Sequence, residues 1–221
     1  MRNKGSLFIT LGLLLIAAAL LLTGYNLYDQ SRAADTARQT AQALQTLLPQ
    51  PEPEPPAPVP ETPEAPQTPE IPLPEEVEIP DYILNPDKKM PTETVDGVEY
   101  IGILSLPTLE LELPIISQWS YPALKKAPCR YSGSVYKDSL ILAGHNYTSH
   151  FGKLRKLHTG DSVIFTDMEG NVFRFSVAAL EVLQSTDLEG MESGGWPLTL
   201  FTCTTGGQSR VTVRCQREDM P

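Results

Sequence analysis

A cysteine, a histidine and an arginine stand at the ends of apolar runs that are typical of buried strands. His145 closely follows the run 139–143, and Cys203 directly follows the run 198–202. Arg210 opens the next strand-like run after a short connection. A thiolate can attack a carbonyl carbon, an imidazole can transfer protons, and a guanidinium can stabilise an oxyanion. These residue types therefore indicate acyl-transfer chemistry.

The short connection 204–209 between Cys203 and Arg210 predicts a hairpin. If the two strands pair, the guanidinium folds back over the thiol on the same rim of the sheet. Arg214, four residues further on, lies on the same face of a regular strand and is the alternative for this role. We expect Arg210, because it begins the strand nearest to Cys203.

Each of these side chains also has a purely structural interpretation. Cysteine at the end of an apolar strand is often a small buried hydrophobe. His150 and His158 are expected to be solvated loop histidines. A zinc site made by His145, His150 and Cys203 lacks a fourth ligand and a recognised spacing. We therefore expect no metal site and no cofactor.

The cysteine count favours at least one free thiol. Cys129, Cys203 and Cys215 form no CxxC pair, and any single bridge leaves one cysteine over. This argues against a disulfide framework, although a bridge between Cys129 and Cys215 remains open. An unpaired thiol outside the cell is at risk of oxidation unless it is buried or kept for its reactivity.

The N-terminal segment predicts a membrane anchor. Residues 7–22 carry no charge, and the uncharged stretch continues to Tyr28, which is enough for a helix to cross a bilayer. Arg2 and Lys4 precede it, so residues 1–6 are expected in the cytoplasm and the rest of the chain outside. A cleaved signal peptide is the alternative, but no small-x-small site follows the apolar run.

Two segments of unusual composition follow the anchor. Residues 29–48 are rich in Ala and Gln without Gly or Pro, so a helical stalk is expected. Residues 49–80 hold thirteen Pro and eight Glu without Lys or Arg, so a disordered, extended linker is expected. We interpret the linker as a passive tether with a reach of roughly 100 Å.

The charge of the chain is mainly in this linker and excludes some partners. The formal net charge is -10, whereas residues 81–221 hold 13 Lys and Arg against 17 Asp and Glu. They contain no basic run of the kind that neutralises phosphates, so nucleic acid is not an expected partner.

Residues 81–221 form the expected catalytic domain, in which turn residues separate short β-type runs. The expected strands are 98–104, 109–116, 139–143, 162–166, 172–183, 198–202 and 210–214. So many strands with little helical periodicity predict an all-β fold, either a closed barrel or a sandwich.

The motif Leu-Ala-Gly-His-Asn over 142–146, followed by Leu-Thr-Leu-Phe-Thr-Cys over 198–203 and then by Arg210, resembles the sortases. The chain order His, Cys, Arg differs from papain-like proteases, in which Cys precedes His. The resemblance covers about residues 95–217, and the anchor and extracellular spacer agree with it.

The resemblance implies a closed eight-stranded β-barrel with short helices and a two-step acyl transfer. Cys203 would be the nucleophile, His145 the proton donor to the leaving amine, and Arg210 the oxyanion and substrate-positioning group. The substrates would be secreted proteins with a C-terminal sorting signal of the LPxTG kind. The acceptor amine would come from a peptidoglycan precursor or a pilin lysine, at the outer face of a Gram-positive cell membrane.

The resemblance also places a signal-binding groove beside the connection 184–197 that precedes the Cys203 strand. Thr202, Leu188 and Met191 are its expected substrate-binding residues. The short connection between Cys203 and Arg210 favours a class B-like or class D-like enzyme. Two other functions stay open: a thiol hydrolase that uses water as acceptor, and a non-catalytic surface adhesin in which the cysteine is only core.

Overall fold

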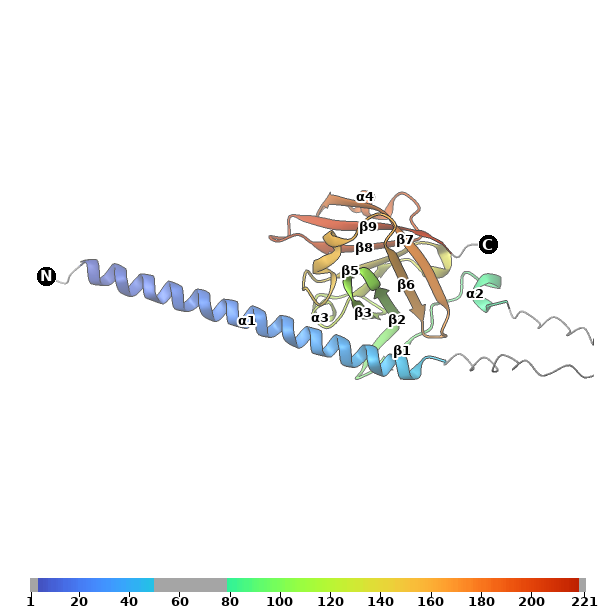
Figure 1. Cartoon of the computed structure of the whole chain (residues 1–221), viewed down its shortest axis with the longest axis horizontal. Helices are drawn as coiled ribbons and strands as arrows, with labels where there is room; N and C mark the ends of the chain where they lie inside the picture. Colours follow the sequence, from blue (N-terminus) through green and yellow to red (C-terminus); the bar gives the residue numbers. More distant parts are fainter. Residues whose placement is uncertain (1–3, 50–78, 219–221) are drawn as a thin grey trace, which may run out of the picture.

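The computed structural model describes residues 4–49 and 79–218, which form a long helix and a β-barrel (Figure 1). The helix lies along one side of the barrel, and its N-terminal half projects well beyond it. The expected cytoplasmic segment 1–6 is described only from Lys4 onward. Residues 50–78, which make up most of the expected linker 49–80, lie outside the described residues.

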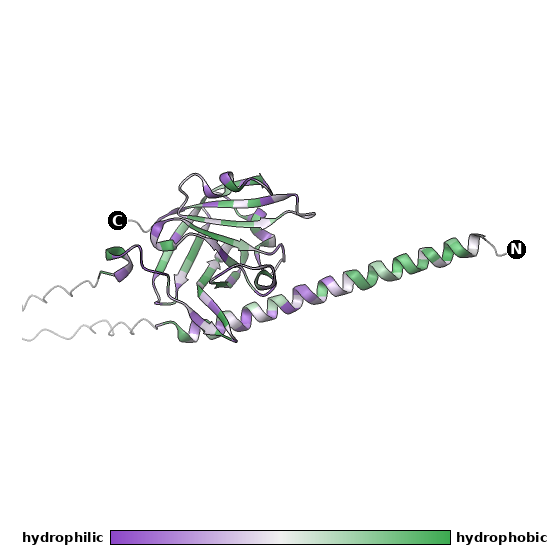
Figure 2. Ribbon diagram, turned by 180° about the vertical axis from the view of Figure 1, so that it is seen from behind, coloured by the Kyte–Doolittle hydropathy of each residue, from purple (hydrophilic) through white to green (hydrophobic). Residues whose placement is uncertain are grey.

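Helix α1 runs without a break from Lys4 to Leu47. It includes both the segment expected to span a membrane and the segment expected to form a stalk. Figure 2 shows hydrophobic residues all around its N-terminal half, whereas polar residues become frequent towards the barrel. The apolar half has a mean hydropathy of 2.5, and none of it is buried against the protein. By length and composition this helix can cross a membrane.

Eight strands close into a barrel. Their order is β2-β3-β4-β5-β8-β9-β7-β6, and β6 pairs back onto β2, while the short β1 extends the β2 edge as a hairpin. The strands are β1 (Glu93–Val95), β2 (Val98–Leu106), β3 (Leu111–Ile116), β4 (Cys129–Ser132), β5 (Leu140–Gly144), β6 (Ser162–Asp167), β7 (Val172–Gln184), β8 (Leu198–Cys203) and β9 (Ser209–Arg217). The expected closed eight-stranded barrel is confirmed.

Short helices connect the strands, as expected. The α-helical turns are α2 (Asp81–Leu84), α3 (Tyr121–Leu124) and α4 (Leu188–Glu192), and the 3-10 turns are η1 (Pro107–Leu109), η2 (Val135–Lys137) and η3 (Phe151–Lys156). Each of the seven expected strands overlaps an observed one. Strand β3 begins at Leu111 and not at Leu109, because Leu109 is the last residue of η1 and the φ of 53° at the next residue, Glu110, breaks the extended backbone. Strands β1 and β4 were not expected from the sequence.

The second half of α1 packs on the outside of the barrel. Its buried residues recur at helical spacing, at Ala33, Ala37, Ala41 and Leu44, each 5% exposed or less. Leu44 belongs to a hydrophobic cluster on the outer face of the sheet, which we call the outer cluster; its other members are Tyr100, Ile103, Ile116, Ala127, Cys129 and Met168. Small alanines allow the helix to approach the sheet closely. The helix is therefore part of the folded body.

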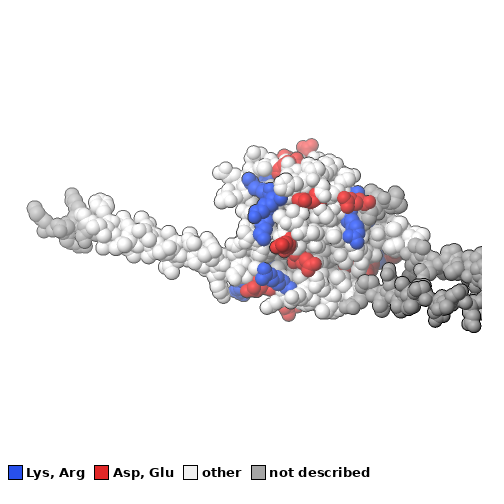
Figure 3. All heavy atoms as spheres, viewed as in Figure 1, with Lys and Arg blue, Asp and Glu red and all other residues white. Residues whose placement is uncertain are grey.

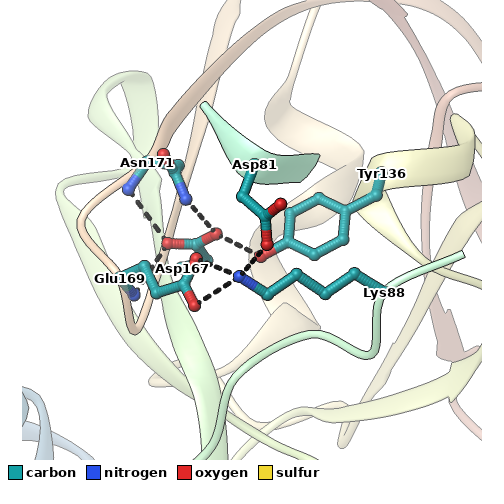
Figure 4. A network of polar contacts seen from close by, with 6 residues as sticks. All are labelled: Asp81, Lys88, Tyr136, Asp167, Glu169 and Asn171. Atoms are coloured by element: carbon teal, nitrogen blue, oxygen red, sulfur yellow. Dashed lines mark hydrogen bonds and ion pairs between the residues drawn. The ribbon is translucent and has the colours of Figure 1, made fainter. Parts of the chain in front are cut away.

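A polar network fastens α2 and the segment that follows it to the barrel (Figure 4). The buried Asp167 carboxylate accepts hydrogen bonds from the Tyr136 hydroxyl at 2.7 Å and from the Asn171 backbone and side-chain N–H groups at 2.9 Å. Lys88 forms ion pairs with Asp81 at 3.0 Å and Glu169 at 2.8 Å. The segment that emerges from the linker is thus tied to the turn between β6 and β7.

Candidate active site

Three neighbouring strands bring His145, Cys203 and Arg210 into one row. Strands β5 and β8 run parallel with Gly144 opposite Thr202, so the next position along both strands places His145 beside Cys203. Strands β8 and β9 form the expected hairpin, in which Cys203 is directly opposite Arg210. The thiol thus lies between the imidazole and the guanidinium, at the edge of the sheet where the strands turn into loops.

Strand alternation places this row on the outer face of the barrel. Leu198 and Leu200 on β8 and Val211 and Val213 on β9 fill the interior, each 4% exposed or less. Successive side chains of a strand point to opposite faces of the sheet. Cys203 is an odd number of residues from Leu198 and Leu200, so its side chain points outwards. Its side chain is half-buried and reaches a surface cavity.

The cavity next to Cys203 has a volume of about 150 Å³ and a largely apolar wall. Leu188 and Met191, the two residues expected to line a groove, stand on one side of it, on and around α4. Arg210 also lines it. Four of the six residues predicted from the sequence therefore line this cavity: Leu188, Met191, Cys203 and Arg210. His145 lies beside Cys203 at the same edge of the sheet.

An aromatic group forms the other side of the same cavity. Trp119 packs edge-on against Tyr121 at 5.6 Å and lies 5.8 Å from Tyr131, which in turn packs edge-on against Phe201 at 5.4 Å between ring centroids. Phe201 is two residues before Cys203 on the same face of β8. These residues could not be found from the sequence, because they come from three separate segments that only the fold brings together.

Thr202 takes a different position. Its side chain is 2% exposed and, by strand alternation, points to the opposite face of β8 from Cys203. It lines a second hollow with Asn146 and Arg155, and Cys203 borders this hollow as well. Within the described residues its hydroxyl has no hydrogen-bond partner. Thr202 adjoins the cysteine in sequence but does not share the cavity of Leu188 and Met191.

The two candidate arginines have different surroundings. Arg210 is half-exposed, and one of its terminal nitrogens donates to the backbone carbonyls of Gly207 at 3.0 Å and Ser209 at 3.2 Å. Arg214 is 3% exposed and lies opposite Thr199, away from the thiol. These positions favour Arg210 as the cation beside Cys203.

Arg214 instead holds α4 against the sheet. Its guanidinium donates to Glu181 at 2.6 Å, to the Met191 carbonyl at 2.8 Å and to the Thr199 hydroxyl at 3.1 Å. A further bond goes to the Gly190 carbonyl. Because these bonds span β7, β8 and α4, Arg214 fixes the wall of the cavity that carries Met191.

The backbone around His145 is shaped by its glycine neighbour. A Cβ atom at Gly144 would lie 2.4 Å from the Phe151 ring, so only glycine lets the first residue of η3 pack beneath the strand end. The His145 ring stacks on Tyr147 with a centroid distance of 4.4 Å and an angle of 3°. Burial lowers the pKa of His145, Lys125 lowers it further, and the negative charge of Asp29 on α1 opposes both.

The other two histidines differ in their exposure to solvent. His158 is exposed, as expected, with 85% of its side chain accessible. The expectation for His150 is wrong, because its side chain is 0% exposed and packs beside Tyr147 with 5.5 Å between ring centroids. Burial lowers the pKa of His150 to about 4. This burial could not be predicted from local sequence, because the covering helix α1 lies more than a hundred residues away.

All three cysteines are free thiols. Cys129 lies in the outer cluster and Cys215 in the barrel interior, so the two face opposite sides of the sheet and form no bridge. Burial raises the pKa of each to about 12. Cys203 alone among them reaches a surface cavity. Within the described residues, no three metal-binding side chains lie close enough together to hold an ion.

A family model described as "Sortase domain" matches residues 104–218, which is just over half of the chain and includes His145, Cys203 and Arg210. The chain belongs to the sortase family. Sortases are cysteine transpeptidases, so the resemblance read from the two motifs is confirmed.

Named sortases resemble this chain over its barrel. Sortase A of Bacillus anthracis is 27% identical over 118 residues, which are 51% of this chain and 56% of that protein. The chain thus matches little more than half the length of this relative.

Solved sortase structures share the fold. Streptococcus pneumoniae sortase C matches with a TM-score of 0.51 and 22% identity, over 57% of this chain and 69% of that one. Corynebacterium diphtheriae sortase A matches with a TM-score of 0.50 and 23% identity, over 64% and 68%. These names belong to classes A and C, so the expected class B-like or D-like assignment stays a prediction.

Proposed function

We propose that this sortase is a membrane-anchored transpeptidase in which Cys203 is the nucleophile, His145 the proton donor and Arg210 the oxyanion-binding group. The observation that carries the proposal is the row of these three side chains across β5, β8 and β9, at an apolar cavity on the outer face of the barrel.

The first half of the reaction forms an acyl-enzyme. The Cys203 thiolate attacks the carbonyl carbon of the scissile peptide bond, and the oxygen takes up the negative charge beside the Arg210 guanidinium. The tetrahedral intermediate collapses as the C–N bond breaks. His145 gives its proton to the departing amine, which leaves a thioester on Cys203.

The second half transfers the acyl group to an amine. The amine attacks the thioester carbonyl, His145 takes up the proton that the amine loses, and the Cys203 thiolate leaves. A new amide bond replaces the one that was cut. Water in place of the amine would yield a carboxylic acid, so the balance of amide and acid products distinguishes a transferase from a hydrolase.

The cavity fits an apolar peptide segment ahead of the scissile bond. Leu188 and Met191 on one side and Trp119 and Tyr131 on the other offer aliphatic and aromatic surface, which suits the Leu and Pro of an LPxTG-like signal. We propose secreted proteins with such a C-terminal signal as substrates, and a peptidoglycan precursor or a pilin lysine as the acceptor. The solved sortase C of Streptococcus pneumoniae is described in terms of pilin substrate specificity.

We place the enzyme at the outer face of the cell membrane, with residues 7–28 as a single span and residues 81–221 as the extracellular catalytic domain. The apolar half of α1 supports this, because it is uncharged and free of contact with the barrel. Figure 3 shows no Lys, Arg, Asp or Glu on the visible side of that half, whereas charges of both signs cover the barrel. Arg2 and Lys4 favour a cytoplasmic N-terminus.

The test is intact-mass analysis of the full chain in detergent after incubation with LPxTG-like and NPxTG-like peptides, with and without an added amine. We expect an acyl adduct on Cys203 and an amide product only when the amine is present. Cys203→Ala should abolish both.

The chain offers matched controls in its two buried thiols. Cys129→Ala and Cys215→Ala each remove one thiol without touching the cavity, and both should keep the adduct. An adduct that persists in Cys203→Ala, or that maps to another cysteine, would refute the proposed mechanism. Free acid as the sole product at saturating amine would establish a hydrolase.

A further inference from the structure

Helix α1 reaches the loop that carries His145. The Tyr147 hydroxyl donates a hydrogen bond to the Asp29 carboxylate of α1 at 2.6 Å, and Gln30 donates to the neighbouring Thr148 hydroxyl. Tyr147 is also the residue whose ring lies parallel to the His145 imidazole at 4.4 Å. A chain of contacts therefore runs from the helix, through one aromatic ring, to the histidine beside Cys203.

We propose that Tyr147 and Asp29 are positioning residues for His145, so that docking of the N-terminal helix completes the active site. This inference rests on the proposed function, in which His145 is the proton donor. Tyr147 fixes the plane of the imidazole, and Asp29 fixes Tyr147.

His145 needs such a support because of its place in the fold. It follows the last residue of β5, where the ladder of backbone hydrogen bonds to β8 ends and a loop begins. A proton donor must be held within hydrogen-bond reach of the leaving group, and a small displacement has a large effect on rate. Parallel stacking on Tyr147 restricts the rotation of the imidazole ring without occupying either of its nitrogens.

Tyr147 needs a support in its turn, and the helix supplies it. A hydrogen bond from a neutral hydroxyl to a carboxylate is short and strong, and this one is partly shielded from water. The pKa of Tyr147 is raised to about 12, by burial first and then by the Asp29 carboxylate, so the phenol keeps its proton at neutral pH. Tyr147 therefore acts as a steady donor throughout the working range.

The charges around the imidazole add a second effect of the same contact. Asp29 from α1 is the negative charge that raises the pKa of His145, whereas Lys125 from the segment after α3 lowers it. His150, from the same loop as His145, is also close and is held neutral by burial. Loss of the Asp29 charge therefore shifts His145 towards its neutral form, which cannot donate the proton.

The helix has a second attachment that serves as a control. Gln45, four helical turns beyond Asp29, donates a hydrogen bond to Glu112 on β3 at 2.8 Å. This bond also joins α1 to the barrel, but it lies far along the helix from the His145 loop. Its removal takes away one exposed contact between α1 and the barrel and leaves the contacts of Tyr147 and His145 in place.

The experiment compares Asp29→Asn, Tyr147→Phe, Tyr147→Leu and Gln45→Ala in the full chain in detergent. Tyr147→Phe removes the hydrogen bond but keeps the stacked ring, and Tyr147→Leu removes both. We expect kcat to fall about threefold to tenfold in Asp29→Asn and Tyr147→Phe and more in Tyr147→Leu, with KM for the peptide little changed. Gln45→Ala should match the wild type in both constants.

Two pH measurements complete the test. The limb of the pH–rate profile that reports His145 should move to lower pH in Asp29→Asn and stay in place in Gln45→Ala. Nuclear magnetic resonance of chains with labelled histidine rings should show the same shift in the titration of His145 itself, with His145→Ala identifying the signal. Because the titration needs no turnover, it tests the contact even if no peptide is processed.

The inference is overturned if Asp29→Asn and Tyr147→Phe behave like Gln45→Ala in kcat and in the titration of His145. Failure of the proposed function looks different, because the wild type would then form no amide product, or His145→Ala would form it at the full rate, whatever the titration of His145 shows.

Discussion

At the scale of single residues, the register of the sheet separates side chains that are chemically alike. Cys203 opens into a cavity, whereas Cys129 and Cys215 are fully buried with the pKa of each raised to about 12. Thiols with such a pKa stay protonated near neutral pH and are poor nucleophiles. Arg210 and Arg214 also differ in position, because only Arg210 lies opposite Cys203.

The two arginines should respond differently to the same substitution. Arg210→Lys is expected to lower kcat/KM about a hundredfold with little change in the unfolding temperature, because lysine lacks the rigid fork that holds an oxyanion. Arg214→Lys is expected to cost roughly 1–3 kcal/mol of stability, because the buried carbonyls of Gly190 and Met191 lose their donor. Peptide-transfer kinetics and thermal unfolding of the full chain measure both effects. A stable but inactive Arg214→Lys beside an active Arg210→Lys would exchange the two roles.

His150 predicts a loss of stability in acid. Its pKa is about 4 in the folded protein, against an ordinary value of 6.5, mainly because burial disfavours the charged ring. A lowered pKa means that the folded state binds the proton less well than the unfolded chain, so stability falls as the pH drops from about 6.5 towards 4. Between pH 7 and pH 5 this amounts to about 2 kcal/mol.

The measurement is urea unfolding of the full chain at pH 7 and pH 5, compared with His150→Phe. The substitution should reduce the difference between the two pH values by most of that amount. His158→Phe is the matched control, because 85% of the His158 side chain is already in water. Equal pH dependence in wild type and His150→Phe would show that His150 titrates normally in the folded protein.

At the scale of elements, the strands that carry the proposed catalytic residues were predictable. Strand β5 is a continuous apolar run, β8 is mostly apolar with two threonines among its six residues, and a polar turn precedes Arg210. The hairpin between β8 and β9 follows from its short connection. The parallel pairing of β5 with β8 does not, because more than fifty residues separate them and local pattern carries no register between distant strands.

Other elements could not be predicted for equally physical reasons. Strand β4, with the sequence Cys-Arg-Tyr-Ser, is too short to show an alternation, and it joins β3 through the single pair Ile116–Cys129. The burial of His150 and the contact of Tyr147 depend on α1, an element from the far end of the sequence. Local patterns thus indicated the strands, whereas the side chains that respond to distant elements needed the fold.

At the scale of the whole molecule, the packing of α1 on the barrel changes the role expected for the linker. The sequence suggested that residues 49–80 tether the catalytic domain to its anchor. In the structure the helix before the linker is already packed on the barrel, from Asp29 to Leu44, so its contacts rather than the length of the linker place the barrel. The barrel therefore lies next to the point where the apolar half of α1 ends, and the loop that carries His145 and Tyr147 contacts the helix there.

This arrangement predicts that a charge at Leu44 releases the helix. Leu44 is 0% exposed and packs in the outer cluster with Cys129, so Leu44→Asp would bury a carboxylate among apolar side chains.

In a Cys203→Ser background, maleimide labelling followed by mass spectrometry should show neither remaining thiol reacting. Leu44→Asp should expose Cys129 while Cys215, inside the barrel, stays protected. Gln39→Asp, on the exposed side of the same helix, should leave both thiols protected. If Cys129 reacts no faster in Leu44→Asp than in Gln39→Asp, the packing of Leu44 is not what shields this thiol from the reagent.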